Sequence, residues 1–193
     1  WGVNRYSNQT SEERRQDLAY RFGRARSSIA KEELFDALRD PSFDVRYEAI
    51  IALGHLPLSQ SIAKALESML KYEGFVELQY AALTSLGRLK SKSSSFAIVG
   101  FLDHKNSLLR ARAIRSLADL KDVSSLDQIR KIINNDPEIS CRLAASSALG
   151  KFKDRSSLNS LVSFYYNLAN EKNPASEEPR SKVILLAISK ILK

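Results

Sequence analysis

Residues 40–56 read DPSFDVRYEAIIALGHL, and three similar stretches follow it along the chain. In this first stretch the apolar residues Val45, Ala49 and Leu53 recur at i, i+4 and i+8, so they lie on one face of a helix. Asp40 is placed to cap that helix, and Pro41 fits its first position, where a missing N–H costs nothing. The later stretches are YEGFVELQYAALTSLGRL (72–89), HKNSLLRARAIRSLADL (104–120) and DPEISCRLAASSALGKF (136–152). The sequence therefore predicts one amphipathic helix that is repeated along the chain.

A large apolar residue marks the register of these helices, and a small residue usually follows it. Glycine occupies that following position in four copies, and alanine does so in one. Glycine there predicts either helix termination or a close approach between two backbones. The large residues are Phe22, Leu53, Leu86, Leu117, Leu149 and Ile188, and the small ones are Gly23, Gly54, Gly87, Ala118 and Gly150.

A second apolar segment precedes each of these helices, with serine at or near its start, where a hydroxyl can cap a helix. One helix pair cannot bury its own apolar face, so neighbouring pairs must share a core. The pattern predicts an all-α fold, a right-handed α-solenoid of about five helix pairs with an N-terminal capping helix. Residues 11–193 are expected to form one domain, after a linker or juxtamembrane segment at 1–10. The expected boundaries are 11–26 for the cap and 27–56, 59–89, 92–120, 124–152 and 155–193 for the repeats.

The repeated stretch resembles the HEAT-like repeat, especially the short bacterial type first associated with phycobilisome lyases. The pattern Asp-Pro…Val-Arg-x-x-Ala-x-x-Ala-Leu-Gly is matched at Asp40, Pro41, Val45, Arg46, Ala49, Ala52, Leu53 and Gly54, and in the fourth copy at Asp136, Pro137, Arg142, Ala145, Ala148, Leu149 and Gly150. The resemblance implies that arginines in this slot pair with acidic residues at the turns, such as Asp40 and Asp136. Arg110 has no matching Asp-Pro before it and is expected to be freer. The resemblance is nearly silent on function, because many unrelated proteins use this repeat.

Residues 10–53 also resemble the cytoplasmic extension that follows the membrane part of some bacterial major facilitator superfamily transporters. This resemblance rests on the linker SEERRQDLAYRFGRARS (11–27) and the first repeat. It implies a cytoplasmic domain that is tethered to the inner membrane through an upstream region. The chain begins at Trp1 rather than at methionine, which favours a domain cut from a longer protein.

Composition limits the class of protein without naming a partner. Of the 193 residues, 44% are hydrophobic and 27% are charged, as in soluble folded domains. Apolar runs such as FAIVGFL (96–102) are far shorter than the roughly 20 residues needed to cross a bilayer. The lone Cys141 excludes an internal disulfide framework, and its apolar slot predicts a buried, inert thiol. The net charge of +8 favours an anionic partner.

Catalytic motifs are missing from the sequence. It contains no Gly-rich phosphate loop and no G-x-S-x-G motif. His55 and His104 fall in different repeats without another metal ligand at suitable spacing, and both are expected to be exposed near turns. The sequence therefore predicts a protein that is not an enzyme, with no cofactor, no metal and no small-molecule substrate in this domain.

Two surfaces are candidates for partner binding. The second helix of each pair is expected to line a concave face, where Tyr and Arg favour an interface, although an ordinary solvated groove is the alternative. Basic residues also gather where second helices end, forming either an anion-binding edge or a simple complement to the helix C-termini. The concave-face candidates are Tyr47, Ile51, Tyr80, Arg112 and Arg115, and the basic-edge candidates are Arg24, Arg26, Arg88, Lys90, Lys92, Lys151, Lys153 and Arg155.

These observations favour a non-catalytic interaction scaffold, as the cytoplasmic HEAT-repeat domain of a larger transporter-like membrane protein. A protein partner is the first expectation, an acidic membrane surface the second, and nucleic acid a weaker one. One alternative is a nucleic-acid-binding protein that resembles the HEAT-like DNA glycosylases, but those need an aromatic, acidic-centred cleft, and Trp1 is the only tryptophan. The other is a protein related to the bilin lyases, for which only the repeat itself argues.

Overall fold

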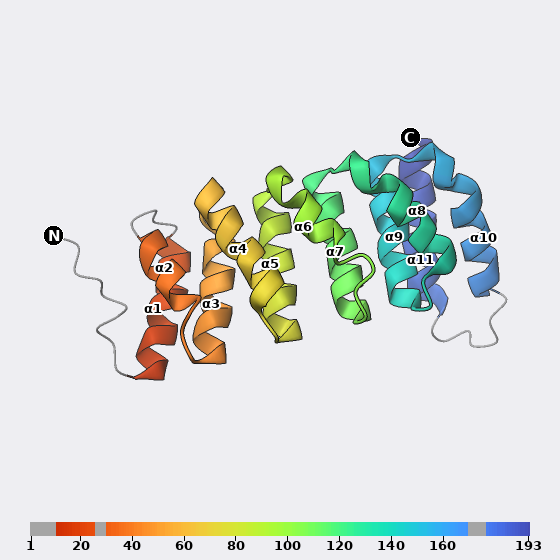
Figure 1. Cartoon of the computed structure of the whole chain (residues 1–193). Coiled ribbons are helices and arrows are strands. Elements are labelled where there is room, and N and C mark those ends of the chain that lie inside the picture. Colours follow the sequence, from red (N-terminus) through yellow and green to blue (C-terminus); the bar gives the residue numbers. More distant parts are fainter. Residues whose placement is uncertain (1–10, 26–29, 170–176) are drawn as a thin grey trace. The chain divides into compact units, whose positions relative to one another are not determined.

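The computed structural model describes residues 11–25, 30–169 and 177–193 (Figure 1). These residues are helical apart from short turns, and none of them lies in a β-strand. The chain divides into two compact units, residues 1–97 (unit 1) and 98–193 (unit 2). Each unit is described by itself, and the single domain expected from the sequence stays a prediction.

Unit 1 is built from a layer of three helices with two more packed against it. The layer consists of α1 (Glu12–Ala25), α3 (Phe43–Leu53) and α5 (Val76–Leu89), with α3 packed between the other two. Helix α2 (Lys31–Ala37) packs on α3, and α4 (Gln60–Tyr72) packs on α5. Helix α1 packs on α3 and comes before the first helix pair, the place predicted for the capping helix.

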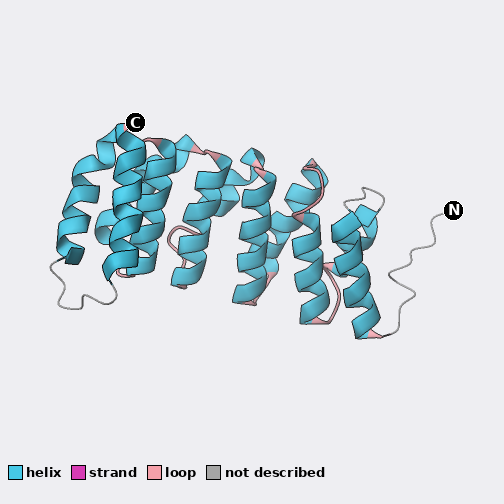
Figure 2. Cartoon of the chain, turned by 180° about the vertical axis from the view of Figure 1, so that it is seen from behind, coloured by secondary structure: helices cyan, strands magenta, loops and turns pink. Residues whose placement is uncertain are grey.

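Unit 2 repeats this arrangement (Figure 2). Its layer places α9 (Ile139–Phe152) between α7 (Ser107–Leu120) and α11 (Glu177–Leu192). Helix α8 (Leu126–Asn135) packs on α9, and α10 (Leu158–Ala169) packs on α11. The short α6 (Ser95–Val99) spans the boundary between the units, and one-turn helices η2 (Lys92–Ser94), η3 (Val123–Ser125) and η4 (Arg155–Ser157) precede α6, α8 and α10. The predicted all-α fold of five HEAT-like pairs after a cap is therefore confirmed.

The large residues that set the register form much of the core. Leu53, Leu86, Leu117 and Leu149 are fully buried, whereas Phe22 is half-buried. At the end of unit 2, α11 leaves Leu185, Leu186 and Leu192 exposed, so its outer face is not the polar face typical of a terminal cap. None of the helices in the described ranges is both long and apolar enough to span a bilayer.

The Asp-Pro pairs form turns and do not cap the helices directly, contrary to the prediction. The N-cap of α3 is Ser42, whose Oγ accepts a hydrogen bond from the Val45 N–H at 3.4 Å. Asp40 lies two residues earlier, and its Oδ1 accepts from the Ser42 N–H at 2.9 Å. Asp136 accepts in the same way from the Glu138 N–H at 2.9 Å. An Asx side chain readily bonds the backbone two residues on, which moves the start of the helix beyond the proline.

The regular spacing of glycine along the chain reflects close packing between successive second helices. A Cβ atom at Gly54 would lie 2.6 Å from the Ser85 Cβ, and one at Gly150 would lie 2.7 Å from the Ala187 Cα. At Gly23 it would lie 2.7 Å from the Ala52 Cα. No side chain larger than hydrogen fits such gaps unless the helices move apart. The close-approach interpretation of these glycines is therefore correct.

Lysine, rather than glycine, ends three of the second helices. Lys90, Lys121 and Lys153 are the C-cap residues of α5, α7 and α9, each with a φ of 54° or 55° in the left-handed region. Glycine is the usual residue at such caps because it has no Cβ to clash. Gly150 lies inside α9 and has no positive φ, so helix termination does not explain it.

Arginine–carboxylate pairs connect several of the helix pairs to a neighbouring turn. Arg46 Nε bonds Glu73 at 3.2 Å, and Arg110 donates to both carboxylate oxygens of Asp136 at 2.8 Å. Arg110 is therefore not freer than Arg46, contrary to the prediction, because its partner lies in the next repeat instead of its own turn. Asp40 takes its arginine from α1, with Arg15 Nε at 2.6 Å. A similar pair joins Arg130 to Asp154.

Replacement of Gly150 tests the close approach. In an unconstrained helix Gly→Ala stabilises by about 1 kcal/mol. Here we expect Gly150→Ala to lower the free energy of unfolding by about 1–3 kcal/mol, because the new methyl group overpacks the contact with Ala187. Gly74→Ala is the control, since its Cβ would meet nothing within 4 Å. Urea unfolding followed by circular dichroism measures both. Stabilisation by Gly150→Ala would show that the helices do not meet there.

The Arg110–Asp136 pair predicts a pH-dependent stability. Burial by itself would raise the pKa of Asp136, but hydrogen bonds from Arg110 and from the Glu138 N–H outweigh it and lower that pKa. A lowered pKa contributes stability that is present above the carboxyl's ordinary range and is lost as pH falls through the folded-state value. We expect Asp136→Asn to cost about 1.5–3 kcal/mol near pH 7.

The control for this pair is Asp127→Asn, because the Asp127 side chain is 83% exposed beside Arg130 and should contribute under about 1 kcal/mol. Urea unfolding over a series of pH values should show the cost of Asp136→Asn shrinking as pH drops below about 4, where this carboxyl begins to protonate in the unfolded chain. A cost that stays constant down to strongly acidic pH would contradict the role of this ion pair.

Candidate functional site

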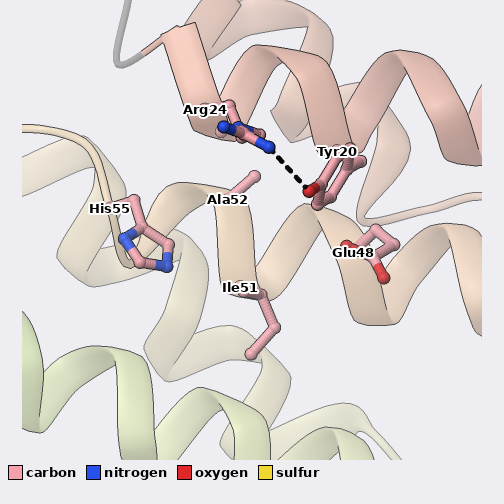
Figure 3. A pocket seen from close by; sticks show the side chains of 7 residues that line it. Tyr20, Arg24, Glu48, Ile51, Ala52 and His55 are labelled. Carbon is pink, nitrogen blue, oxygen red and sulfur yellow. Dashed lines mark hydrogen bonds between the residues drawn. The ribbon is translucent and has the colours of Figure 1, made fainter.

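A pocket opens in unit 1 on the exposed side of α1 and α3. Its volume is about 270 Å³, and Figure 3 shows its side chains. Helix α1 supplies one wall and α3 the other, with residues one helical turn apart on each. We call the exposed side of α1, α3 and α5 the second-helix face of unit 1. The pocket is lined by Tyr20, Gly23, Arg24, Glu48, Ile51, Ala52 and His55.

The floor of the pocket is the glycine contact itself. Gly23 and Ala52 are buried where α1 meets α3, and both line the cavity. Because these two residues have little or no side chain, the larger side chains around them form the walls of the pocket. Ile51 is half-buried and gives an apolar surface beside the floor. The packing of the repeats therefore also shapes the pocket.

One arginine lines the pocket at the end where the helices finish, and a second arginine bonds another of the lining residues. Arg24 Nη1 donates to the Tyr20 hydroxyl at 3.2 Å, and its guanidinium lies 5.9 Å from the centre of the Tyr20 ring (Figure 3). Arg88 of α5 donates from Nη1 to His55 Nε2 at 2.6 Å. Arginine can only donate, so His55 accepts at Nε2 and carries its proton on Nδ1. This end of the pocket is therefore positively charged.

Glu48 is the acidic residue that lines the pocket. Its side chain is half-buried, and within the described ranges it forms no hydrogen bond or ion pair. Burial, and secondly the nearby Asp44 carboxylate, raise the pKa of Glu48. In Figure 3 it lies beside Tyr20, away from His55. The pocket is therefore lined by opposite charges, on Arg24 and Glu48, that do not form an ion pair with each other.

Exposed aromatic rings extend this face beyond the pocket. Tyr20, Tyr47 and Tyr80 lie on α1, α3 and α5 and are 48%, 38% and 36% exposed. The Tyr47 ring stacks on Phe43 with centroids 6.3 Å apart, which limits its movement. Tyr47, Ile51 and Tyr80 were expected on the partner-binding face, whereas Tyr20 was not. The pocket forms only when α1 packs on α3, and no spacing within one repeat could have indicated it.

The candidates in unit 2 are placed differently from one another. Arg112 is half-buried, with Nη2 3.5 Å from Asp119 Oδ2 and Nε 3.4 Å from Ser116 Oγ. Asp119 also accepts from Lys151 Nζ at 2.7 Å. These contacts occupy Arg112 within the protein, while Arg115, one turn along α7, is exposed. Binding by Arg112 and Arg115 stays a prediction.

The basic-edge residues fall into both units. Arg24, Arg88, Lys90 and Lys92 belong to unit 1, and Lys151, Lys153 and Arg155 belong to unit 2. Arg26 lies outside the described residues. Lys90 and Lys153 cap helix C-termini, and Arg24, Arg88 and Lys151 lie in last turns, as simple complementation of the helix ends would require. An anionic partner for this edge stays a prediction.

The remaining candidates for chemistry are held by structural contacts. Cys141 is buried, its thiol lies 3.3 Å from the Ser107 carbonyl oxygen, and burial raises its pKa, as expected of an inert thiol. His104 is half-buried rather than exposed, because its ring stacks on Phe101 and its Nδ1 accepts from the Asn106 N–H at 3.0 Å. No group of three His, Cys, Asp or Glu residues in the described part of the chain is arranged to hold a metal ion.

Solved structures with this fold include proteins of different kinds. A computationally designed armadillo repeat protein for modular peptide recognition is 14% identical, with a TM-score of 0.56 and 97% of each chain covered. The CpcE–CpcF complex of phycocyanin lyase from Nostoc sp. is 19% identical, with a TM-score of 0.50, 95% of this chain and 76% of that chain covered. Human deoxyhypusine hydroxylase is 16% identical, with a TM-score of 0.50 and coverages of 96% and 83%. Identities this low show the fold alone.

Comparison with curated proteins finds no significant match. The resemblance of residues 10–53 to a transporter extension therefore stays a prediction. HEAT repeats match residues 31–105, 63–150 and 97–169, which together span well over half of the sequence. The helix pairs, the glycine contacts and this match agree, and the chain belongs to the HEAT-repeat family.

Proposed function

We propose that the chain is a non-catalytic protein-interaction module that binds an extended peptide segment on the second-helix face of unit 1. The observation that carries this proposal is the set of exposed tyrosines Tyr20, Tyr47 and Tyr80, on successive second helices beside a pocket. Tyrosine offers a large, rigid contact area together with a hydroxyl, and it is enriched among the residues that dominate interface energy.

The geometry of this face suits an extended segment. Tyr47 and Ile51 lie at i and i+4 along α3, with His55 in the turn that follows it, and Tyr80, Thr84 and Arg88 lie at i, i+4 and i+8 along α5. Side chains at this spacing lie on one side of a helix. A peptide that crosses α1, α3 and α5 would thus meet an aromatic ring and a polar group on each helix. A designed armadillo protein for peptide recognition, with the same fold, supports this kind of use.

The contacts that hold the charged groups of this face favour protein recognition over catalysis as its role. Arg88 and His55 bond each other, and Arg24 bonds Tyr20, so these groups are positioned by contacts within the protein. Such fixed donors suit recognition, because less side-chain freedom is lost on binding.

Proposals of a membrane-tethered or cytoplasmic location rest on the sequence resemblance of residues 10–53, and the coding sequence upstream of Trp1 tests them.

Peptide display tests the proposal directly. A random peptide library displayed on phage should yield sequences that bind the full chain. We expect Tyr47→Ala and Tyr80→Ala each to weaken the selected peptides at least about tenfold, as loss of an interface anchor does. Tyr72→Ala is the matched control, because Tyr72 is 75% exposed on α4 and should change affinity less than about twofold. Fluorescence anisotropy gives the dissociation constants.

Two results would contradict this function. One is a library that yields no specific binder. The other is a set of binders whose affinity falls as much with Tyr72→Ala as with the changes at Tyr47 and Tyr80. Circular dichroism of each variant confirms that the helices remain intact.

A further inference from the structure

We propose that the outer side of the α10–α11 pair is a docking face for an amphipathic helix of a partner protein, whose apolar stripe is flanked by acidic residues. We call this surface the α10–α11 face. It consists of exposed side chains, Val162 and Tyr166 on α10 and Leu185, Ser189 and Leu192 on α11. The face belongs to unit 2, so the inference goes beyond the peptide binding proposed for unit 1 and does not depend on it.

The first argument is that one row of α11 is exposed although the matching row of every preceding second helix is buried. Leu185 lies three residues before the register residue Ile188 and is 47% exposed. The five residues at this position in the other second helices are all 0% exposed, and they are Ala19, Ile50, Leu83, Ile114 and Ser146. Ser189 follows Ile188 and is exposed as well, whereas the glycine or alanine at its position is buried in all five. The exposed row of α11 is therefore one that this fold otherwise covers.

The second argument concerns the element that covers this row within each unit. A Cβ atom added to Gly150 of α9 would lie 2.7 Å from the Ala187 Cα of α11, and Ser146 lies one turn before Gly150 on the same side of α9. In unit 1 the Ser85 hydroxyl of α5 donates to the Ile50 carbonyl oxygen of α3 at 3.0 Å. In both units a neighbouring helix packs on the row. The exposed row of α11 is thus suited to receive a helix.

The third argument is that α10 presents apolar side chains on the same side. Helix α10 follows η4 as α8 follows η3, and in this alignment Val162 and Tyr166 take the places of Arg130 and Asn134. Both residues of α8 contact the next pair, since Arg130 bonds a carboxylate in the turn before α10 and Asn134 donates to the Ser160 hydroxyl at 3.4 Å. Apolar side chains thus replace polar ones where one pair meets the next. This exchange favours an apolar contact with the partner.

The fourth argument concerns charge, which specifies the partner further. Residues 179–193 contain four basic residues and no acidic one, and residues 156–169 contain no charged residue. Lys190 lies one turn after Leu186 and Lys193 one turn after Ser189, and both lysines are exposed. Acidic residues beside the apolar stripe of a partner helix would be attracted to these lysines. A second copy of this chain is disfavoured, because α11 packed on α11 would bring the cations of the two copies together.

The test uses two labelled helical peptides and the full chain. Both peptides carry leucines at i, i+3, i+4 and i+7, with glutamate beside this stripe in one and lysine in the other. At about 0.15 M salt, fluorescence anisotropy should show at least about tenfold tighter binding of the glutamate peptide. Leu185→Asp should weaken that binding about tenfold or more, and Lys190→Glu about threefold or more.

Each variant has a control with the same change of charge. Leu108→Asp alters an exposed leucine of α7, and Lys131→Glu alters an exposed lysine of α8, both outside the α10–α11 face. These controls matter because the net charge of +8 attracts any acidic peptide to some extent. Each control should change the affinity less than about twofold. Equal losses in a variant and its control, or no binding of the glutamate peptide, would overturn the docking face. Circular dichroism confirms that each variant keeps its helices.

Two further measurements distinguish the other possible occupants. In sedimentation velocity the full chain should behave as a monomer, and a dimer that Leu185→Asp dissociates would assign the face to a second copy. Vesicles that contain phosphatidylserine should bind Leu185→Asp and Leu108→Asp equally, and a loss confined to Leu185→Asp would assign the face to a lipid surface. Either result would overturn the partner helix.

The outcome is separable from that of the proposed function. Tyr47→Ala and Tyr80→Ala should leave the affinity of the glutamate peptide unchanged, because both tyrosines lie in unit 1. If these two changes weaken the glutamate peptide and Leu185→Asp does not, the peptide binds unit 1 and the docking face is wrong.

Discussion

The structure depends on how closely successive second helices approach each other within each unit. Gly23 meets Ala52, Gly54 meets Ser85, and Gly150 meets Ala187, with too little space for a methyl group in any of them. Small residues at these positions bring the backbones together and let the large residues beside them, such as Leu53 and Leu86, fill the core completely. These contacts set the spacing between the second helices. The first helices of the pairs and the arginine–carboxylate pairs pack at that spacing. The same contact leaves the hollow between α1 and α3.

The ion pairs extend this connection from one repeat to the next. Arg46 and Arg110 occupy the same slot in their repeats, and each bonds both the backbone of its own turn and the acid of the following one. In the same slot Gln79 bonds two carbonyl oxygens, of Leu70 and Glu73, and so connects neighbouring segments without a charge. At Arg142 the guanidinium lies 4.5 Å from the centre of the Phe164 ring instead. The slot therefore keeps its structural role while its chemistry varies between repeats.

The sequence was sufficient for the fold because its signals are periodic and local. The spacing of the large residues and glycines located every second helix, and the serines indicated where several helices begin. Local reasoning failed where a partner came from elsewhere in the chain. Arg110 was expected to be freer than Arg46 and Arg142 because its own turn lacks an Asp-Pro pair, but its acid comes from the next repeat. Asp40 was assigned as a cap, yet it serves a turn and Arg15. The pocket could not be predicted, since its walls come from two helices that meet only in the folded unit.

The functional account joins this packing to recognition: the glycine contact forms the floor, the tyrosines flank it, and the arginines charge one end. Amide resonances measured by NMR during titration with a peptide selected by phage display test this account most directly. We predict that the amides of Gly23, Ile51 and Ala52 shift as the pocket fills, while those of Ala65 and Ser68, in a hollow between α2 and α4, stay in place. Shifts confined to Ala65, Ser68 and their neighbours, with Gly23 and Ala52 unchanged, would contradict it.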